Sequence, residues 1–125
     1  MNVALWIIQI VLGLAFLVVG YRHAFRFETI AANARTRWAR DVGASNLRII
    51  GILEILGGIG LILPAATGIL PWLTPLAAVM LALVMALAIL FHARRPGEAP
   101  NMVINVVLGI LALAVAYGRF VVEPF

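Results

Sequence analysis

Glu54 is a carboxylic acid within a long apolar stretch of the chain, and its position suggests chemistry. An ionised carboxylate in the hydrocarbon of a bilayer costs at least about 2.5 kcal/mol, so it should be paired, hydrogen-bonded or protonated. The sequence offers few partners. We expect Glu54 to form a ligand-binding or proton-handling site with His23, His92, Asn101, Asn105 and Arg48.

Four of these residues also have a purely structural interpretation. A hydrogen bond between Glu54 and Asn105 would fix the register of two helices, at about 0.6 kcal/mol in a membrane. His23 and His92 fall where helices should end, and a water-exposed imidazole is ordinary there. The two histidines could instead ligate a haem or a metal. Their interfacial positions and the lack of a further ligand motif argue against this, so we predict no metal site.

The elements that must position these residues are four apolar stretches. The chain has 125 residues, of which 65% are hydrophobic and 11% charged, against about 45–50% apolar and 25% charged in soluble domains. A helix needs roughly 20 apolar residues to cross a bilayer. We therefore predict one transmembrane domain over residues 1–125, with spans at about 3–21, 47–63, 72–92 and 102–119. The expected fold is an all-α integral membrane four-helix bundle in up-down-up-down order.

The basic residues indicate how the bundle is oriented. The chain has nine arginines and no lysine, and eight of the arginines lie in the loops after the first and third spans. Cytoplasmic loops collect Lys and Arg, so both loops should face the cytoplasm and both termini should lie outside. This topology accounts for the net charge of +4 without a nucleic-acid partner. Arg119, at the outer end, should reach the lipid headgroups as an anchor.

The segment between the first two spans has apolar residues at helical spacing. They are Phe27, Ile30, Ala34, Trp38 and Val42. This pattern predicts an amphipathic helix lying on the inner membrane surface. A solvated basic loop in contact with anionic lipids is an equally good interpretation.

Three glycines are expected to mediate helix packing. Gly51 and Gly58 share a helical face with Glu54, and Gly20 ends the first span. Small residues let neighbouring backbones approach closely, within one bundle or between copies in a homo-oligomer, and the sequence leaves both open.

Several kinds of chemistry are excluded or unsupported by the sequence. The absence of cysteine excludes thiol redox chemistry and thiolate metal sites. No hydrolase, nucleotide-binding or zinc-protease motif occurs. We predict no catalytic residue, and an accessory membrane subunit fits better than an enzyme.

The stretch at residues 48–64, RIIGILEILGGIGLILP, resembles the R-x-I-G-x-x-E-x-x-G-x-x-G-L-x-L-P signature of the DoxX-like membrane proteins. The end of the first span, residues 71–78, 91–95 and 117–119 are also similar to that family, so the resemblance covers nearly the whole chain. One departure is His23, where many relatives carry a lysine. A lysine would be a permanent partner for Glu54, whereas a histidine titrates near neutrality.

The resemblance implies a membrane component of an oxidoreductase complex, because the family is named after a subunit of a thiosulfate:quinone oxidoreductase. The leading hypothesis is a subunit that binds a quinone or another small lipophile in a polar pocket of the inner leaflet, with a soluble or membrane redox partner. Haem is a less favoured cofactor. A small proton-coupled transporter and a scaffold that docks a soluble partner are the alternatives. The composition, rich in Ala, Gly, Arg and Pro and without lysine, indicates a GC-rich bacterial genome, which fits a location in the bacterial cytoplasmic membrane.

Overall fold

The described residues of the chain form four long helices and several short helical segments. A computed structural model describes residues 2–33, 36, 38–95, 97 and 99–125. The long helices are α1 (Asn2–Phe25), α4 (Ala44–Thr67), α5 (Leu73–Ala93) and α6 (Ala99–Tyr117). Two short helices, α2 (Phe27–Ala32) and α3 (Trp38–Val42), join α1 to α4, and the π-helix η2 (Gly118–Val122) continues α6. The described part of the chain contains no strand.

The long helices are built to face lipid. Each contains an apolar window long enough to cross a membrane, and only 22–33% of each window is buried inside the bundle. Large exposed side chains such as Ile7, Leu56, Leu87 and Ile110 cover the outer surface. A helix that is apolar on all sides lies either in the core of a large protein or in a membrane, and the exposed apolar surface of these helices fits the second case. The predicted multi-pass membrane protein with four spans is confirmed.

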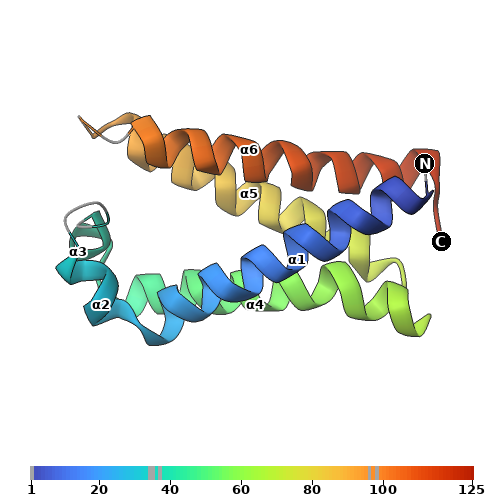
Figure 1. The fold of residues 1–125 in the computed structure, drawn as a ribbon, viewed down its shortest axis with the longest axis horizontal. Coiled ribbons are helices and arrows are strands. Elements are labelled where there is room, and N and C mark those ends of the chain that lie inside the picture. The colour runs from blue at the N-terminus through green and yellow to red at the C-terminus, as the bar shows by residue number, and fades with distance from the viewer. Residues whose placement is uncertain (1, 34–35, 37, 96, 98) are drawn as a thin grey trace.

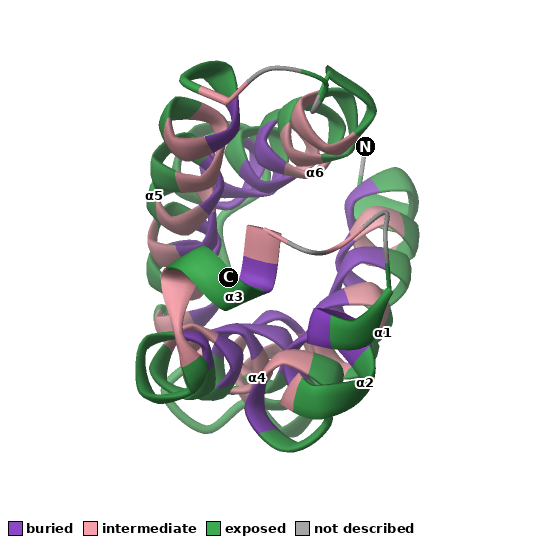
Figure 2. Cartoon of the chain, turned by 90° about the vertical axis from the view of Figure 1, so that its left-hand side faces the viewer, coloured by how far each residue is buried: buried purple, intermediate pink, exposed green. Residues whose placement is uncertain are grey.

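The four long helices form two antiparallel pairs, α1 with α4 and α5 with α6 (Figure 1). The pairs lie close together at the end that carries both chain termini, here called the terminal end. They diverge toward the opposite end, where α2 and α3 are found, and in the end-on view of Figure 2 α3 lies in front of the space between the four long helices. We call this second end the arginine-rich end. The divergence leaves room for a site between the pairs.

The α1–α4 pair is held by close backbone contact. A Cβ atom added to Gly51 would lie 2.6 Å from the carbonyl oxygen of Gly20, and one on Gly58 would lie 2.7 Å from that of Gly13. No side chain fits between the helices at these positions. The core between the two pairs fills the terminal half of the bundle and includes Leu12, Phe16, Leu61, Leu81, Ala112 and Val115.

Helix α4 is longer at both ends than the predicted span of residues 47–63. It begins at Ala44, after Gly43 at the N-cap, and it continues through Pro64 to Thr67. The predicted end at residue 63, just before Pro64, is therefore wrong. A proline in a helix removes the donor to the carbonyl four residues earlier, and Thr74 supplies another donor to that group, the carbonyl of Gly60. Gly68, which follows the helix as its C-cap, has a left-handed φ of 72°.

The segment between α1 and α4 covers the arginine-rich end of the bundle. Buried Ile30, Ala39 and Leu47 form a small apolar cluster, against which Phe27, Trp38 and Val42 pack. The apolar residues expected on one amphipathic helix thus belong to two short helices and face the protein. Ala34, which was part of that pattern, lies outside the described residues.

Candidate functional site

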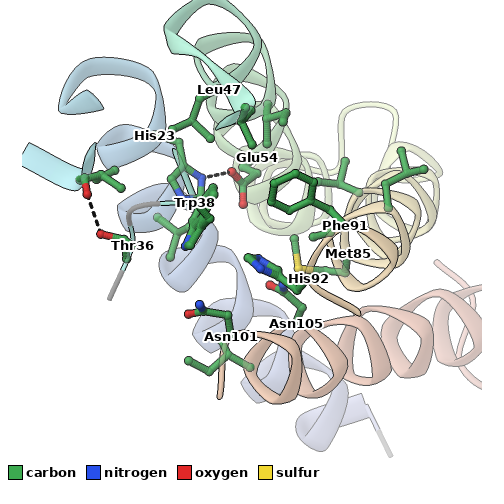
Figure 3. A pocket seen from close by; sticks show the side chains of 18 of the residues that line it. His23, Thr36, Trp38, Leu47, Glu54, Met85, Phe91, His92, Asn101 and Asn105 are labelled. Carbon is green, nitrogen blue, oxygen red and sulfur yellow. Dashed lines mark hydrogen bonds and ion pairs between the residues drawn. The ribbon is translucent and has the colours of Figure 1, made fainter. Parts of the chain in front are cut away.

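A cavity of about 590 Å³ lies at the arginine-rich end, where the helix pairs diverge (Figure 3). All four long helices line it, and α3 contributes Trp38, Asp41 and Val42. Five of the six residues expected in the site line this cavity: His23 from α1, Glu54 from α4, His92 from α5, and Asn101 and Asn105 from α6. The structure thus brings together polar residues that are up to 82 positions apart in sequence, from His23 to Asn105.

His23 and Glu54 form the central contact of the cavity. Nδ1 of His23 lies 2.6 Å from Oε1 of Glu54, which joins α1 to α4. The Glu54 side chain is 2% exposed and that of His23 17%. The α1–α4 glycine contact places them, because Gly51 lies one turn before Glu54 and packs beside Ala24, the neighbour of His23. Their geometry suits a shared proton, which either the carboxylate or the imidazole can carry.

Trp38 stands between the two histidines of the cavity. Its ring centroid lies 5.7 Å from that of His23 and 5.2 Å from that of His92, with interplanar angles of 82° and 89°. Such edge-to-face contacts are favourable for aromatic rings. Trp38 was not expected in the site, since its sequence pattern indicated either an amphipathic helix on the membrane surface or a solvated basic loop.

The other polar residues of the cavity come from the α5–α6 pair. His92 is buried at the end of α5, and Asn101 and Asn105 lie one turn apart on α6, half-buried. In Figure 3 these three side chains gather on one side of the cavity, while Glu54 lies on the other. No group of three or more His, Cys, Asp or Glu residues able to hold a metal ion occurs in the described parts of the chain.

Arg48, the sixth residue expected in the site, does not line the cavity. It is exposed on α4, and its guanidinium lies 5.7 Å from the ring centroid of Phe25. Arg22 does line the cavity but is itself exposed. The buried carboxylate is therefore paired with an imidazole rather than with a guanidinium.

The remaining wall is apolar. Leu53, Val84, Met85, Phe91 and Leu108 line it from three helices. A cavity of this size with an apolar lining and a few polar groups suits a small organic molecule. The polar groups would recognise its oxygen or nitrogen atoms, and the apolar wall would cover its rings or chain.

The terminal end contains a second polar network, which the sequence analysis missed. Arg119 is only 3% exposed, so the expectation of a headgroup anchor is wrong. Its Nε donates to Oε1 of Gln9 at 2.5 Å, and its Nη1 donates to Oδ1 of Asn2 at 2.7 Å and to the carbonyl of Glu123 at 3.1 Å. Nε2 of Gln9 in turn donates to the carbonyl of Leu61.

Two polar residues of the first span could have predicted this network from the sequence. Gln9 is a polar residue inside an apolar span, which is uncommon unless it has a partner, and Asn2 lies seven residues earlier on the same helical face. Buried Arg119 needs acceptors because a charge without them is costly to bury.

The comparisons with known proteins agree with the fold. The family model described as the DoxX-like family matches residues 7–115. That range contains all the residues of the cavity, whereas Asn2 and Arg119 lie outside it. No curated protein and no solved structure matches the chain. A match over this much of the sequence is decisive, and the chain belongs to the DoxX-like family.

Proposed function

We propose that this protein is the membrane subunit of an oxidoreductase-type complex and binds a quinone, or another small lipophile with a polar head, in the cavity at the arginine-rich end. The observation that carries the proposal is the contact of 2.6 Å between His23 and Glu54 at a largely apolar cavity of about 590 Å³. A purely structural pair would not need a cavity beside it.

The lining supports an amphiphilic ligand. A quinone combines a flat apolar ring with two carbonyl oxygens, and it reaches its sites from the bilayer. The apolar wall around Met85 and Phe91 suits the ring, and the amides of Asn101 and Asn105 offer N–H donors for the oxygens. Burial of most of the ligand in such a pocket is typical of small-molecule sites.

The His23–Glu54 pair supports a role in proton transfer. A quinone that gains two electrons also gains two protons when it becomes a quinol. The electrons would come from a redox partner in the complex, while the pair supplies or accepts one proton at a time at the Nδ1–Oε1 contact. Return of the proton would use water at the arginine-rich end, which His23 reaches because it is the more exposed member.

The orientation follows from the arginines. Six described arginines lie at the end that holds the cavity: Arg22, Arg26, Arg40, Arg48, Arg94 and Arg95. By the positive-inside rule this end faces the cytoplasm, with both termini on the other side of a bacterial cytoplasmic membrane. The site then lies in the inner leaflet, accessible to a soluble redox partner.

A transporter has less support. A permeation path must continue from the cavity to the terminal end, but Leu12, Phe16, Leu61 and Leu81 fill that half of the bundle. These side chains are at most 1% exposed. An apolar core of this kind closes the bundle to water and ions.

The test is to purify the protein in mild detergent, identify bound lipophiles by mass spectrometry, and titrate it with decylubiquinone. We expect saturable binding by the wild type. Glu54→Gln should weaken it by about tenfold or more, since hydrogen bonds to charged groups contribute about 1.5–3 kcal/mol. Arg48→Gln is the matched control, because it removes a charge from α4 outside the cavity, and it should bind like the wild type. Absence of both a bound lipophile and saturable binding in the wild type would refute the proposal.

A further inference from the structure

Trp38 carries a buried hydrogen-bond donor, the N–H group of its indole ring. Its Nε1 atom is buried and, among the described residues, has no hydrogen-bond acceptor. An indole nitrogen can only donate, and a buried donor without an acceptor loses the hydrogen bond that water gives it in the unfolded chain. Most buried polar groups in proteins are satisfied, so an exception requires an explanation.

Packing alone does not explain why the residue at position 38 carries a buried N–H group. The contacts of Trp38 with His23 and His92 are edge-to-face contacts between rings, and a phenylalanine ring could make contacts of the same kind without burying an N–H group. Trp38 also lines the cavity. The unsatisfied donor thus belongs to a side chain that lines the cavity.

The position of Trp38 is fixed by the segment around it. The hydroxyl of Thr36 donates to the carbonyl of Ile30 at 2.7 Å, and Nε of Arg40 donates to the carbonyl of Ala31 at 2.6 Å. Asp41 pairs with Arg95 at the end of α5. Ala39, beside Trp38, is fully buried. These contacts hold α3 against α2 and tie it to the residues that follow α5, so the indole is in place before any ligand enters.

We infer that the indole N–H of Trp38 donates a hydrogen bond to an oxygen atom of the molecule that occupies the cavity. This inference rests on the proposed function and narrows it: the ligand is a lipophile whose ring bears a carbonyl, hydroxyl or ether oxygen, and not a plain hydrocarbon or an acyl chain. Trp38 is then a ligand-binding residue. Because it contacts both imidazoles, the bound oxygen lies beside the group that handles the proton.

The experiment compares two probes of similar shape by NMR of the indole N–H groups. The chain has three tryptophans, so ¹⁵N-labelled protein should give three indole signals, and Trp38→Phe identifies one by its loss. Decylubiquinone carries ring oxygens, whereas decylbenzene has a ring and a chain without them. The ring of either probe changes the chemical shifts of nearby indole N–H groups. The difference between the shifts that the two probes cause therefore reports the effect of the ring oxygens.

We expect decylubiquinone to move the Trp38 indole proton downfield and decylbenzene not to do so. Trp6 and Trp72, at the terminal end, should not respond. Trp38→Phe should bind decylubiquinone about three- to tenfold more weakly, as for the loss of one hydrogen bond, while Trp72→Phe, which changes an exposed ring, should bind normally. The NMR comparison is made on the wild-type protein, and if Trp38→Phe does not fold, loss of the other two indole signals in Trp6→Phe and Trp72→Phe assigns the Trp38 signal by elimination.

The outcomes separate the two proposals. If decylubiquinone binds the wild type but the two probes shift the Trp38 signal alike, or if Trp38→Phe binds with wild-type affinity, the inference about Trp38 is wrong and the proposed function stands. If neither probe binds the wild type, the proposed function fails and the inference fails with it.

Discussion

The hydroxyl of Thr74 on α5 lies 2.9 Å from the carbonyl oxygen of Gly60 on α4 and donates a hydrogen bond to it. Gly60 precedes Pro64 by four residues, so a helix without the proline would have satisfied this carbonyl by its own backbone. A side chain of the neighbouring helix thus replaces the missing backbone donor. This allows α4 to continue through a proline within the membrane, as helix neighbours generally do.

Thr74→Val should destabilise the protein, because it keeps the shape of the side chain and leaves the Gly60 carbonyl without that donor. We expect a loss of about 1 kcal/mol, within the range measured for interhelical hydrogen bonds in membranes. The free energy of unfolding can be measured by SDS titration in mixed micelles. Thr67→Val is the control, since the exposed Thr67 hydroxyl bonds within its own helix. Equal effects of the two changes would contradict the role of Thr74.

Gly51→Ala should separate α1 from α4. The added Cβ would lie 2.5 Å from the amide nitrogen of Ala24 and 2.6 Å from the carbonyl oxygen of Gly20, and backbone atoms cannot yield as a side chain can. We expect a loss of about 1–3 kcal/mol, as for overpacked cores. Gly109→Ala is the control, because its Cβ would meet one atom, Cβ of Met85, at 3.3 Å. A fold that tolerates both changes equally would refute the tight contact.

The four long helices could be predicted because hydropathy over some 20 residues is a local property of the sequence. Their ends could not. Pro64 looks like a helix end unless the donor from Thr74 is known, and Gly43, not a polar side chain, precedes α4.

Part of the site was also predictable, because the depth of a residue within a spanning helix follows from its position in the sequence. Counting along helices places His23 and Glu54 at one depth, and the structure has them in contact. The same counting excludes Arg48 from the site. It lies six residues before Glu54, which places the two side chains about 120° apart around the helix axis. Trp38 could not be found in this way, since its position depends on how the connection between α1 and α4 folds back over the cavity.

His23 and Glu54 should show strong energetic coupling. His23→Phe keeps a ring but leaves the Glu54 carboxyl buried without its partner, and we expect a loss of about 1–3 kcal/mol, the cost of an unsatisfied buried group. In a protein that already carries Glu54→Gln, the same change should cost less, because no carboxylate remains to be stranded. Unfolding measurements on the four proteins of this double-mutant cycle give the coupling energy. Additive effects would mean that the contact does not stabilise the bundle.

Arg119→Lys should destabilise the packing of the chain termini at the terminal end. The guanidinium reaches three acceptors from Nε and Nη1: Gln9, Asn2 and the carbonyl of Glu123. It also lies 4.2 Å from the ring centroid of Phe125 and 5.6 Å from that of Trp6. A lysine ammonium is a compact donor group without this planar fork, so it cannot meet all these partners. We expect a loss of about 1–3 kcal/mol in the free energy of unfolding and faster removal of the last residues by carboxypeptidase.

The control for this change is Arg94→Lys, at an exposed arginine after α5, which should alter the free energy of unfolding by at most about 0.5 kcal/mol.

The same variants also test whether the polar network at the terminal end affects the cavity at the arginine-rich end. Because the core of Leu12, Phe16 and Leu81 lies between Arg119 and the cavity, Arg119→Lys should leave the binding of decylubiquinone by the folded protein unchanged. A loss of binding without unfolding would show that the two polar regions are coupled, and it would revive the possibility of a path through the bundle.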